Sequence, residues 1–107
     1  MRMIDYCRVI DYVLNKGKIG EIYNIAAGNE INNIQLTNYI LKGLNKKKDC
    51  IKHVPDRLGH DRRYNLDIQK IKKLGFKPVF SFDQALSGTI EWYKNNQQWW
   101  EKLKKRS

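Results

Sequence analysis

Apolar side chains recur at helical spacing near the start of the chain. Between residues 4 and 16 they fall three and four positions apart and form a single stripe, made by Tyr6, Val9, Ile10, Val13 and Leu14. Lys16 suits the negative end of a helix dipole, and Gly17 is a residue type that commonly ends a helix. The pattern predicts an amphipathic helix over residues 4–16.

The middle of the chain contains two further helical patterns. Residues 34–45 carry a second apolar face, and either Asn32 or Asn33 can cap the start of this helix. A shorter helix is expected after Asp67, which can cap it, and before Gly75, which can end it. Both patterns place an amide or carboxylate side chain where the first free backbone N–H groups of a helix need an acceptor.

The last helices and the stretches between helices complete the picture. Ser81 and Gln84 have capping-box spacing and predict the start of a long helix, with a helical tail over residues 97–105. Residues 21–26 and 50–54 contain β-branched side chains and are expected to form short strands. Helices alternating with short strands indicate an α/β fold, or an α+β small domain. No repeat or long linker divides residues 1–107, so one portion is expected.

Composition and charge narrow the possible functions. The 107 residues carry a net charge of +10, which attracts anions such as phosphorylated metabolites or nucleic acid. The lysine runs lack RNA-recognition motifs, and we interpret them as solvated surface. A small basic nucleic-acid-binding protein stays an alternative. No apolar run reaches the roughly 20 residues of a membrane helix, and the N-terminus does not have the pattern of a signal peptide, so we expect a cytoplasmic protein without membrane contact.

Metal and nucleophile chemistry find little support in the residue pattern. Cys7, Cys50, His53 and His60 do not have zinc-finger spacing, so we expect thiols with a structural role and no metal site. The chain also lacks a Gly-x-Gly-x-x-Gly fingerprint and a nucleophile elbow. We therefore expect no catalytic and no cofactor-binding residue in this chain.

Residues 55–64 are rich in charge and poor in apolar side chains. Arg57 is of the type suited to a bidentate grip on a diphosphate, His60 could add a hydrogen bond, and Gly59 would let the loop approach a ligand closely. The other interpretation is a surface turn with internal Asp–Arg pairs, which residue types alone favour. Asn33 has a similar ambiguity, because an Asn before a helix is more often a cap than a ligand contact.

Several motifs together resemble one family. Residues 20–25 read Gly-Glu-Ile-Tyr-Asn-Ile, and Asn29, Glu30 and Asn33 follow. Residues 56–64 read Asp-Arg-Leu-Gly-His-Asp-Arg-Arg-Tyr, and the later landmarks are Leu-Gly-Phe-Lys-Pro at 74–78 and Thr-Ile-Glu-Trp-Tyr at 89–93. In order and spacing these resemble the C-terminal, substrate-binding part of the dTDP-glucose 4,6-dehydratases, which are extended short-chain dehydrogenases/reductases. Leu58 departs from the family, which usually has Pro there.

The resemblance implies a function and a set of contacts. Members convert dTDP-glucose to dTDP-4-dehydro-6-deoxyglucose and water, on the route to rhamnose and other deoxysugars, with NAD held by an N-terminal Rossmann domain. That domain and the catalytic Tyr, Lys, Asp and Glu groups do not map onto this chain, so the chain alone is expected to bind no NAD and to be inactive. The residues expected to contact the nucleotide sugar are Asn33, Asp56, Arg57, Leu58, Gly59 and His60.

The resemblance also implies partners. We expect dTDP-glucose as the ligand, an NAD-binding half that could be a separate chain, and a homodimer for the intact enzyme. A fragment of a related NAD-dependent nucleotide-sugar epimerase or dehydratase is the alternative within the wider group.

Overall fold

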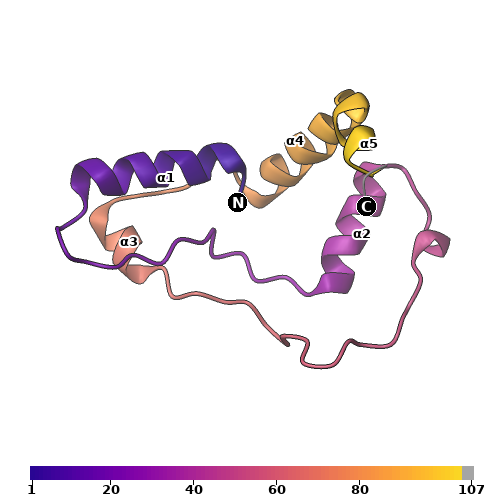
Figure 1. Ribbon diagram of the computed structural model, residues 1–107, viewed down its shortest axis with the longest axis horizontal. Coiled ribbons are helices and arrows are strands. Elements are labelled where there is room, and N and C mark those ends of the chain that lie inside the picture. Colours follow the sequence, from indigo (N-terminus) through magenta and orange to yellow (C-terminus); the bar gives the residue numbers. More distant parts are fainter. Residues whose placement is uncertain (105–107) are drawn as a thin grey trace.

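The computed structural model describes residues 1–104 as a set of helices joined by long irregular segments. The elements are α1 (Met3–Lys16), α2 (Asn33–Gly43), the short 3-10 helix η1 (Lys48–Cys50), α3 (Gln69–Leu74), α4 (Phe82–Asn95) and α5 (Gln97–Lys104). Figure 1 shows α1 and α3 at one end of the molecule and α2, α4 and α5 at the other. Two irregular segments, residues 17–32 and 51–68, run between the two ends.

The apolar core lies between α1 and α3. Within residues 1–104, the buried hydrophobic residues of this core are Val9, Ile68, Ile71 and Phe76. Tyr12 packs its ring 5.7 Å from that of Phe76, and its hydroxyl donates a 2.9 Å hydrogen bond to the Leu74 carbonyl oxygen. Of the stripe predicted for the first helix, Val9 lies in this core and Val13 packs against it, while Ile10 and Leu14 stay exposed. Tyr12 lies outside the predicted stripe.

A buried carboxylate ties the helix α1 to the segment that follows α3. Asp5 is 1% exposed, and its Oδ1 accepts a 3.1 Å hydrogen bond from the backbone N–H of Val79. A buried polar group needs such a partner, because its water contacts are lost. Asp5 thus fixes the chain beyond α3 against the start of α1.

Helices α2, α4 and α5 form the second end without a buried residue. The rings of Tyr39 and Phe82 meet edge to face at 5.4 Å between α2 and α4. A Cβ added at Gly43 would lie 2.7 Å from Ile90 Cδ1, so a larger residue there would have to displace the end of the Ile90 side chain. Near the C-terminal end of α4, Trp100 of α5 donates a 2.9 Å hydrogen bond from Nε1 to the Tyr93 carbonyl oxygen. This end is joined by surface contacts rather than by a core.

The caps largely follow the sequence. Asn32 caps α2 in a capping box, with Gln35 N–H donating to its Oδ1 at 2.9 Å, and Ser81 and Gln84 form the predicted box at α4. At α3 the N-cap is Ile68 rather than the predicted Asp67, although Asp67 Oδ1 accepts a 2.9 Å hydrogen bond from the Gln69 N–H. Gly75 ends α3 with φ of +108°, as expected for a left-handed cap.

Some helix ends differ from expectation. Gly17 has φ of −67°, so it is not a left-handed cap; it is needed because an added Cβ would collide with the Val13 carbonyl oxygen. The helix α2 ends at Gly43 rather than Asn45, which adopts φ of +53°. Of the predicted tail over 97–105, residue 105 lies outside the described residues.

The predicted strands over 21–26 and 50–54 require a correction. No residue between 1 and 104 is in a strand. Residues 21–26 lie against the core through Tyr23, Ile25 and Ala26, but no other extended segment pairs with their backbone, and a strand exists only in a ladder. At 50–54, Cys50 belongs to η1, where Ile51 N–H donates to the Lys48 carbonyl oxygen. The helices of the expected fold class are thus present and its alternating strands are not.

The molecule is expanded for its length. Its radius of gyration is 17.1 Å, against about 13 Å for a compact chain of this size. Large apolar side chains lie in water, among them Leu14, Ile19 and Ile22. Among residues 1–104, no helix has both the length and the apolar character needed to cross a lipid bilayer. The described residues therefore leave much apolar surface uncovered.

Candidate functional site

The charged run at residues 55–64 forms an exposed loop with a tight turn. The backbone N–H of His60 donates to the Arg57 carbonyl oxygen at 3.3 Å, which closes the turn over residues 57–60. Gly59 has φ of +70°, a conformation that side-chain-bearing residues rarely adopt, and an added Cβ would meet nothing within 4 Å. Asp56 Oδ1 lies 3.1 Å from His60 Nδ1, so these two side chains join across the turn.

Arg57 and Leu58 occupy the exposed part of this turn. The Leu58 side chain is fully exposed. The Arg57 guanidinium forms no hydrogen bond or ion pair within residues 1–104. An arginine without a protein partner keeps all its donors for an anion, and its planar fork fits two phosphate oxygens.

The internal Asp–Arg pairs considered from the sequence do not form within residues 55–64. Asp56 pairs with His60, and Asp61 accepts a short hydrogen bond from the Tyr64 hydroxyl. This hydrogen bond to the Asp61 carboxylate raises the pKa of Tyr64, because it stabilises the protonated phenol, and a smaller contribution comes from burial. The carboxylates of the loop are thus engaged without neutralising Arg57.

Arg63 is held by a residue from another segment. Glu30 forms an ion pair with Arg63 Nε, and its Oε2 also accepts a 2.6 Å hydrogen bond from Arg63 Nη2 and a 3.2 Å bond from Asn65 Nδ2. Sequence reasoning did not assign this role to Glu30. The sequence contains no clear sign of this ion pair, since 33 residues separate Glu30 from Arg63 and no periodicity connects them.

Asn33 is the first residue of α2, and Asn32 performs the capping. The cap interpretation of Asn33 is therefore wrong. Its side chain has no hydrogen-bond partner among residues 1–104, and the first turn of α2 contains no acidic residue. Figure 1 shows this end of α2 and the segment between η1 and α3 on the same lower side of the view. No hydrogen bond or ion pair joins Asn33 to residues 56–60 in the part described.

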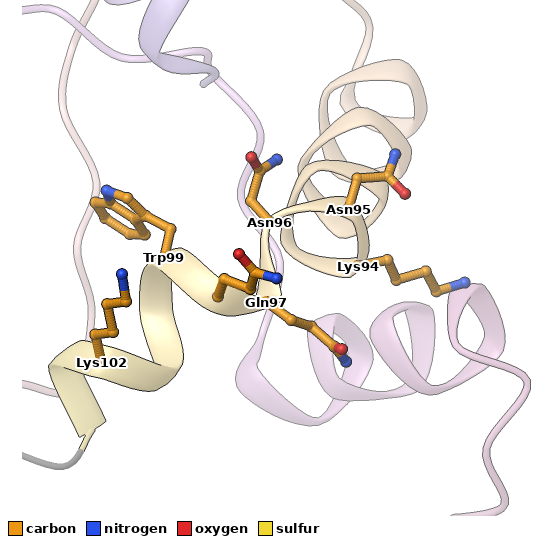
Figure 2. A pocket seen from close by; sticks show the side chains of 7 residues that line it. Lys94, Asn95, Asn96, Gln97, Trp99 and Lys102 are labelled. Atoms are coloured by element: carbon orange, nitrogen blue, oxygen red, sulfur yellow. The ribbon is translucent and has the colours of Figure 1, made fainter.

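Two hollows lie at or near these elements. A cavity of about 540 Å³ is bordered by the small residues 26–28, by Arg63 and Tyr64 of the loop at residues 55–64, and by Asn65 directly after it. A hollow of about 580 Å³ lies at the elbow between α4 and α5 (Figure 2). There Lys94 donates to the Gly43 carbonyl oxygen at 3.3 Å and Asn96 to that of Trp92 at 2.8 Å, so part of its polar lining is already used. The candidate loop does not line this second hollow.

The tryptophans at this elbow pack against one another. Trp92 and Trp99 meet edge to face with centroids 5.3 Å apart, and Trp100 carries Lys104 5.3 Å above its ring. These contacts indicate a packing role for the three tryptophans. Figure 2 shows Trp99 and Lys102 along α5, while Lys94 extends toward α2.

The described residues show neither a metal cluster nor a catalytic tyrosine–lysine pair. No cluster of three or more His, Cys, Asp or Glu residues within 1–104 could hold a metal ion, and Cys7 and Cys50 are free and exposed, so neither belongs to the core. Tyr12 and Lys16 have the Tyr-x-x-x-Lys spacing of nicotinamide-dependent reductases. The Tyr12 hydroxyl is bound to Leu74 and its ring packs on Phe76, so we assign it to the core.

The chain is similar to known proteins over nearly its whole length. It is 47% identical over 105 residues to a dTDP-glucose 4,6-dehydratase from Streptomyces niveus, covering 97% of this chain and 31% of that protein. The crystal structure of a dTDP-glucose 4,6-dehydratase from Bacillus anthracis in complex with NAD superimposes with a TM-score of 0.86 at 42% identity, covering 94% of this chain and 32% of that one.

A second solved structure gives the same result. A double mutant of a dTDP-glucose 4,6-dehydratase from Streptomyces venezuelae with NAD bound has a TM-score of 0.87 and 44% identity, covering 94% of this chain and 31% of that one. No family model matches the sequence. The chain thus spans about a third of the length of the relatives it matches.

Proposed function

The chain belongs to the dTDP-glucose 4,6-dehydratase family, where it corresponds to the C-terminal portion of its relatives, and we propose that it supplies the nucleotide-sugar-binding part of such an enzyme. The ligand would be dTDP-glucose. The contacts would come from Asn33 and from the loop at residues 56–60.

One observation carries the proposal. Of the three arginines of the loop, Arg63 is bound to Glu30, whereas Arg57 and Arg62 are exposed and have no partner in residues 1–104. Of these two, Arg57 lies in the turn over residues 57–60. Gly59 allows a ligand to approach, since nothing lies within 4 Å of the place where a Cβ would be. An unpaired arginine on an open turn suits a diphosphate, because two charge-assisted hydrogen bonds can form at once.

The 107 residues are proposed to lack dehydratase activity by themselves. The relatives' structures contain NAD, but this sequence has no Gly-x-Gly-x-x-Gly fingerprint, and its one Tyr-x-x-x-Lys pair has its tyrosine in the core. The residues present do not fit the dinucleotide, so we derive no hydride step from them. The oxidation and dehydration would need an NAD-binding portion.

The uncovered apolar surface supports the proposal that substrate binding and NAD binding reside in separate portions of the enzyme. Ile22 is 82% exposed, and the backbone of residues 21–26 has no ladder partner in the described residues. An NAD-binding portion, in the same chain or in another, would cover these groups and offer a strand to pair with them. The assembled enzyme would be a homodimer in the cytoplasm, as the family resemblance implies.

The test compares two exposed arginines of the same loop. We expect dTDP to shift the amide NMR peaks of residues 33 and 57–60, and Arg57→Ala to weaken dTDP binding by about tenfold or more, as expected for a lost charged hydrogen bond. Arg62→Ala is the matched control, since Arg62 has the same charge and forms no ion pair in residues 1–104. It should weaken binding far less.

Three outcomes would contradict the proposal. The absence of any dTDP-induced shift would remove the nucleotide-sugar site. Equal losses for both variants, together with duplex DNA binding that falls steeply with salt, would favour a nucleic-acid-binding protein. Turnover of dTDP-glucose by the purified chain with added NAD would show that the chain needs no NAD-binding portion.

A further inference from the structure

We propose that Glu30 is a positioning residue that fixes the loop at residues 55–64 relative to the start of α2. The proposal rests on the proposed function, because it concerns how the same site is held. Glu30 does not touch the ligand in this scheme. It acts through Arg63 and Asn65.

The contacts of Glu30 single it out. Side chains of residues 51–66 form hydrogen bonds and ion pairs with each other and with Glu30. Within residues 1–104, their contacts of this kind to other segments all involve the Glu30 carboxylate. Both of its oxygens are used, one by Arg63 Nε and the other by Arg63 Nη2 and Asn65 Nδ2. A carboxylate facing a guanidinium in this way fixes orientation as well as distance.

The position of Glu30 in the chain connects the two parts of the site. Glu30 lies three residues before Asn33, and Arg63 lies six residues after Arg57. At no more than about 3.6 Å per residue, the chain can extend only about 11 Å from Glu30 to Asn33 and about 22 Å from Arg63 to Arg57. One ion pair therefore limits how far the two groups of expected ligand contacts can separate.

The same contact removes one of the two other arginine charges of the loop, since Arg62 stays unpaired in residues 1–104. Arg63 would otherwise attract the anion as Arg57 does, at a place six residues away. With Glu30 bound, the charge of Arg63 is neutralised locally. The pair is accessible, with 48% of the Glu30 side chain and 63% of the Arg63 side chain exposed, so salt should weaken it.

The chain offers a matched control. Glu21 also forms an exposed ion pair, with Lys70, and its side chain is 47% exposed. Glu21→Gln therefore removes a comparable charge at a place outside the loop, whereas Glu30→Gln removes the proposed tether. A charge-reversed double variant, Glu30→Arg with Arg63→Glu, restores an ion pair between the same two positions.

The experiment measures backbone mobility and ligand affinity on the full 107-residue chain. In Glu30→Gln, ¹⁵N relaxation should report increased picosecond-to-nanosecond motion for residues 57–65, with unchanged peaks for the core residues Val9 and Ile71. The dTDP dissociation constant should rise about fivefold, and the double variant should recover most of both effects. Glu21→Gln should change neither.

The outcomes separate this inference from the proposed function. Loop motion and dTDP affinity in Glu30→Gln equal to those in Glu21→Gln would overturn it, as would a double variant no better than Glu30→Gln. If the unsubstituted chain does not bind dTDP at all, the proposed function fails, and the relaxation data alone then decide whether Glu30 holds the loop.

Discussion

The α1–α3 end of the molecule and the loop at residues 51–67 are held by different forces. At the first, Val9, Ile71 and their neighbours exclude water from a small core, and the buried Asp5 accepts a hydrogen bond from the Val79 backbone N–H. In the loop no residue is buried, and the contacts are ion pairs and hydrogen bonds in water. Apolar burial gives stability that salt hardly changes, whereas exposed charge pairs contribute little stability and respond to salt.

This difference suits a stabilising role for the α1–α3 end and a ligand-binding role for the loop. A ligand loop needs unpaired donors and accessible backbone, and both would be lost in a packed core. The cost is that the loop depends on a few polar contacts, of which those of Glu30 connect it to the rest of the described chain. Substitutions at the two places should therefore have separable effects on stability and on ligand binding.

The largest effect is expected for the core. Ile71→Ala removes a buried side chain from a core that has four buried hydrophobic residues in the described part of the chain, and such a change commonly costs about 2–5 kcal/mol. We expect the cooperative urea unfolding transition, followed by circular dichroism, to be lost. Ile22→Ala is the control, because Ile22 is the same residue type on exposed surface. Equal destabilisation by both would mean that the stability of the chain does not reside between α1 and α3.

A glycine substitution tests both regions with the same chemical change. At Gly75, φ is +108° and an added Cβ would lie 2.7 Å from the Tyr12 hydroxyl, which itself binds Leu74. Gly75→Ala should cost at least the roughly 1–2 kcal/mol of left-handed strain, plus displacement of Tyr12. At Gly59, φ is +70° but the space is open.

Gly59→Ala should therefore change the free energy of unfolding by no more than about 0.5 kcal/mol, because an exposed loop can relax the strain. The affinity for dTDP should fall. The measurement is urea unfolding of both variants beside dTDP titration. A Gly59 variant as destabilised as the Gly75 variant would contradict the separation of the two regions.

The helices were predictable because their signals are local. The Ser81–Gln84 capping box and the left-handed Gly75 each involve residues within about one turn of backbone. The strands were not, because the β-favouring residues at 21–26 can form a ladder only with a distant segment, and the described residues contain none. Local propensity fixes an extended backbone here but cannot provide its partner.

The candidate site was predictable in part for the same reason. The turn around Gly59 was predictable, because it depends on residue types within residues 56–60 alone. Two details depended on neighbours that the sequence does not reveal. Asn32 rather than Asn33 became the cap, and Glu30 rather than an aspartate of the loop became the partner of Arg63. That residues 56–60 and Asn33 bind a nucleotide sugar stays a prediction.

The smallest effect concerns an exposed ion pair at the packed end. Lys70 of α3 lowers the pKa of Glu21 below 4.5, first through a hydrogen bond and second through its charge. A carboxyl group with a lowered pKa in the folded state contributes stability that is present above pH 4.5 and is lost as the pH falls through the lowered value. The unfolding midpoint of the unsubstituted chain should thus fall slightly more on acidification than that of Glu21→Gln. The urea midpoint of both chains across this pH range measures it, and the difference should shrink in high salt. Identical pH profiles would mean that the packed end owes its stability to apolar burial without help from this pair, which would make the contrast with the loop sharper still.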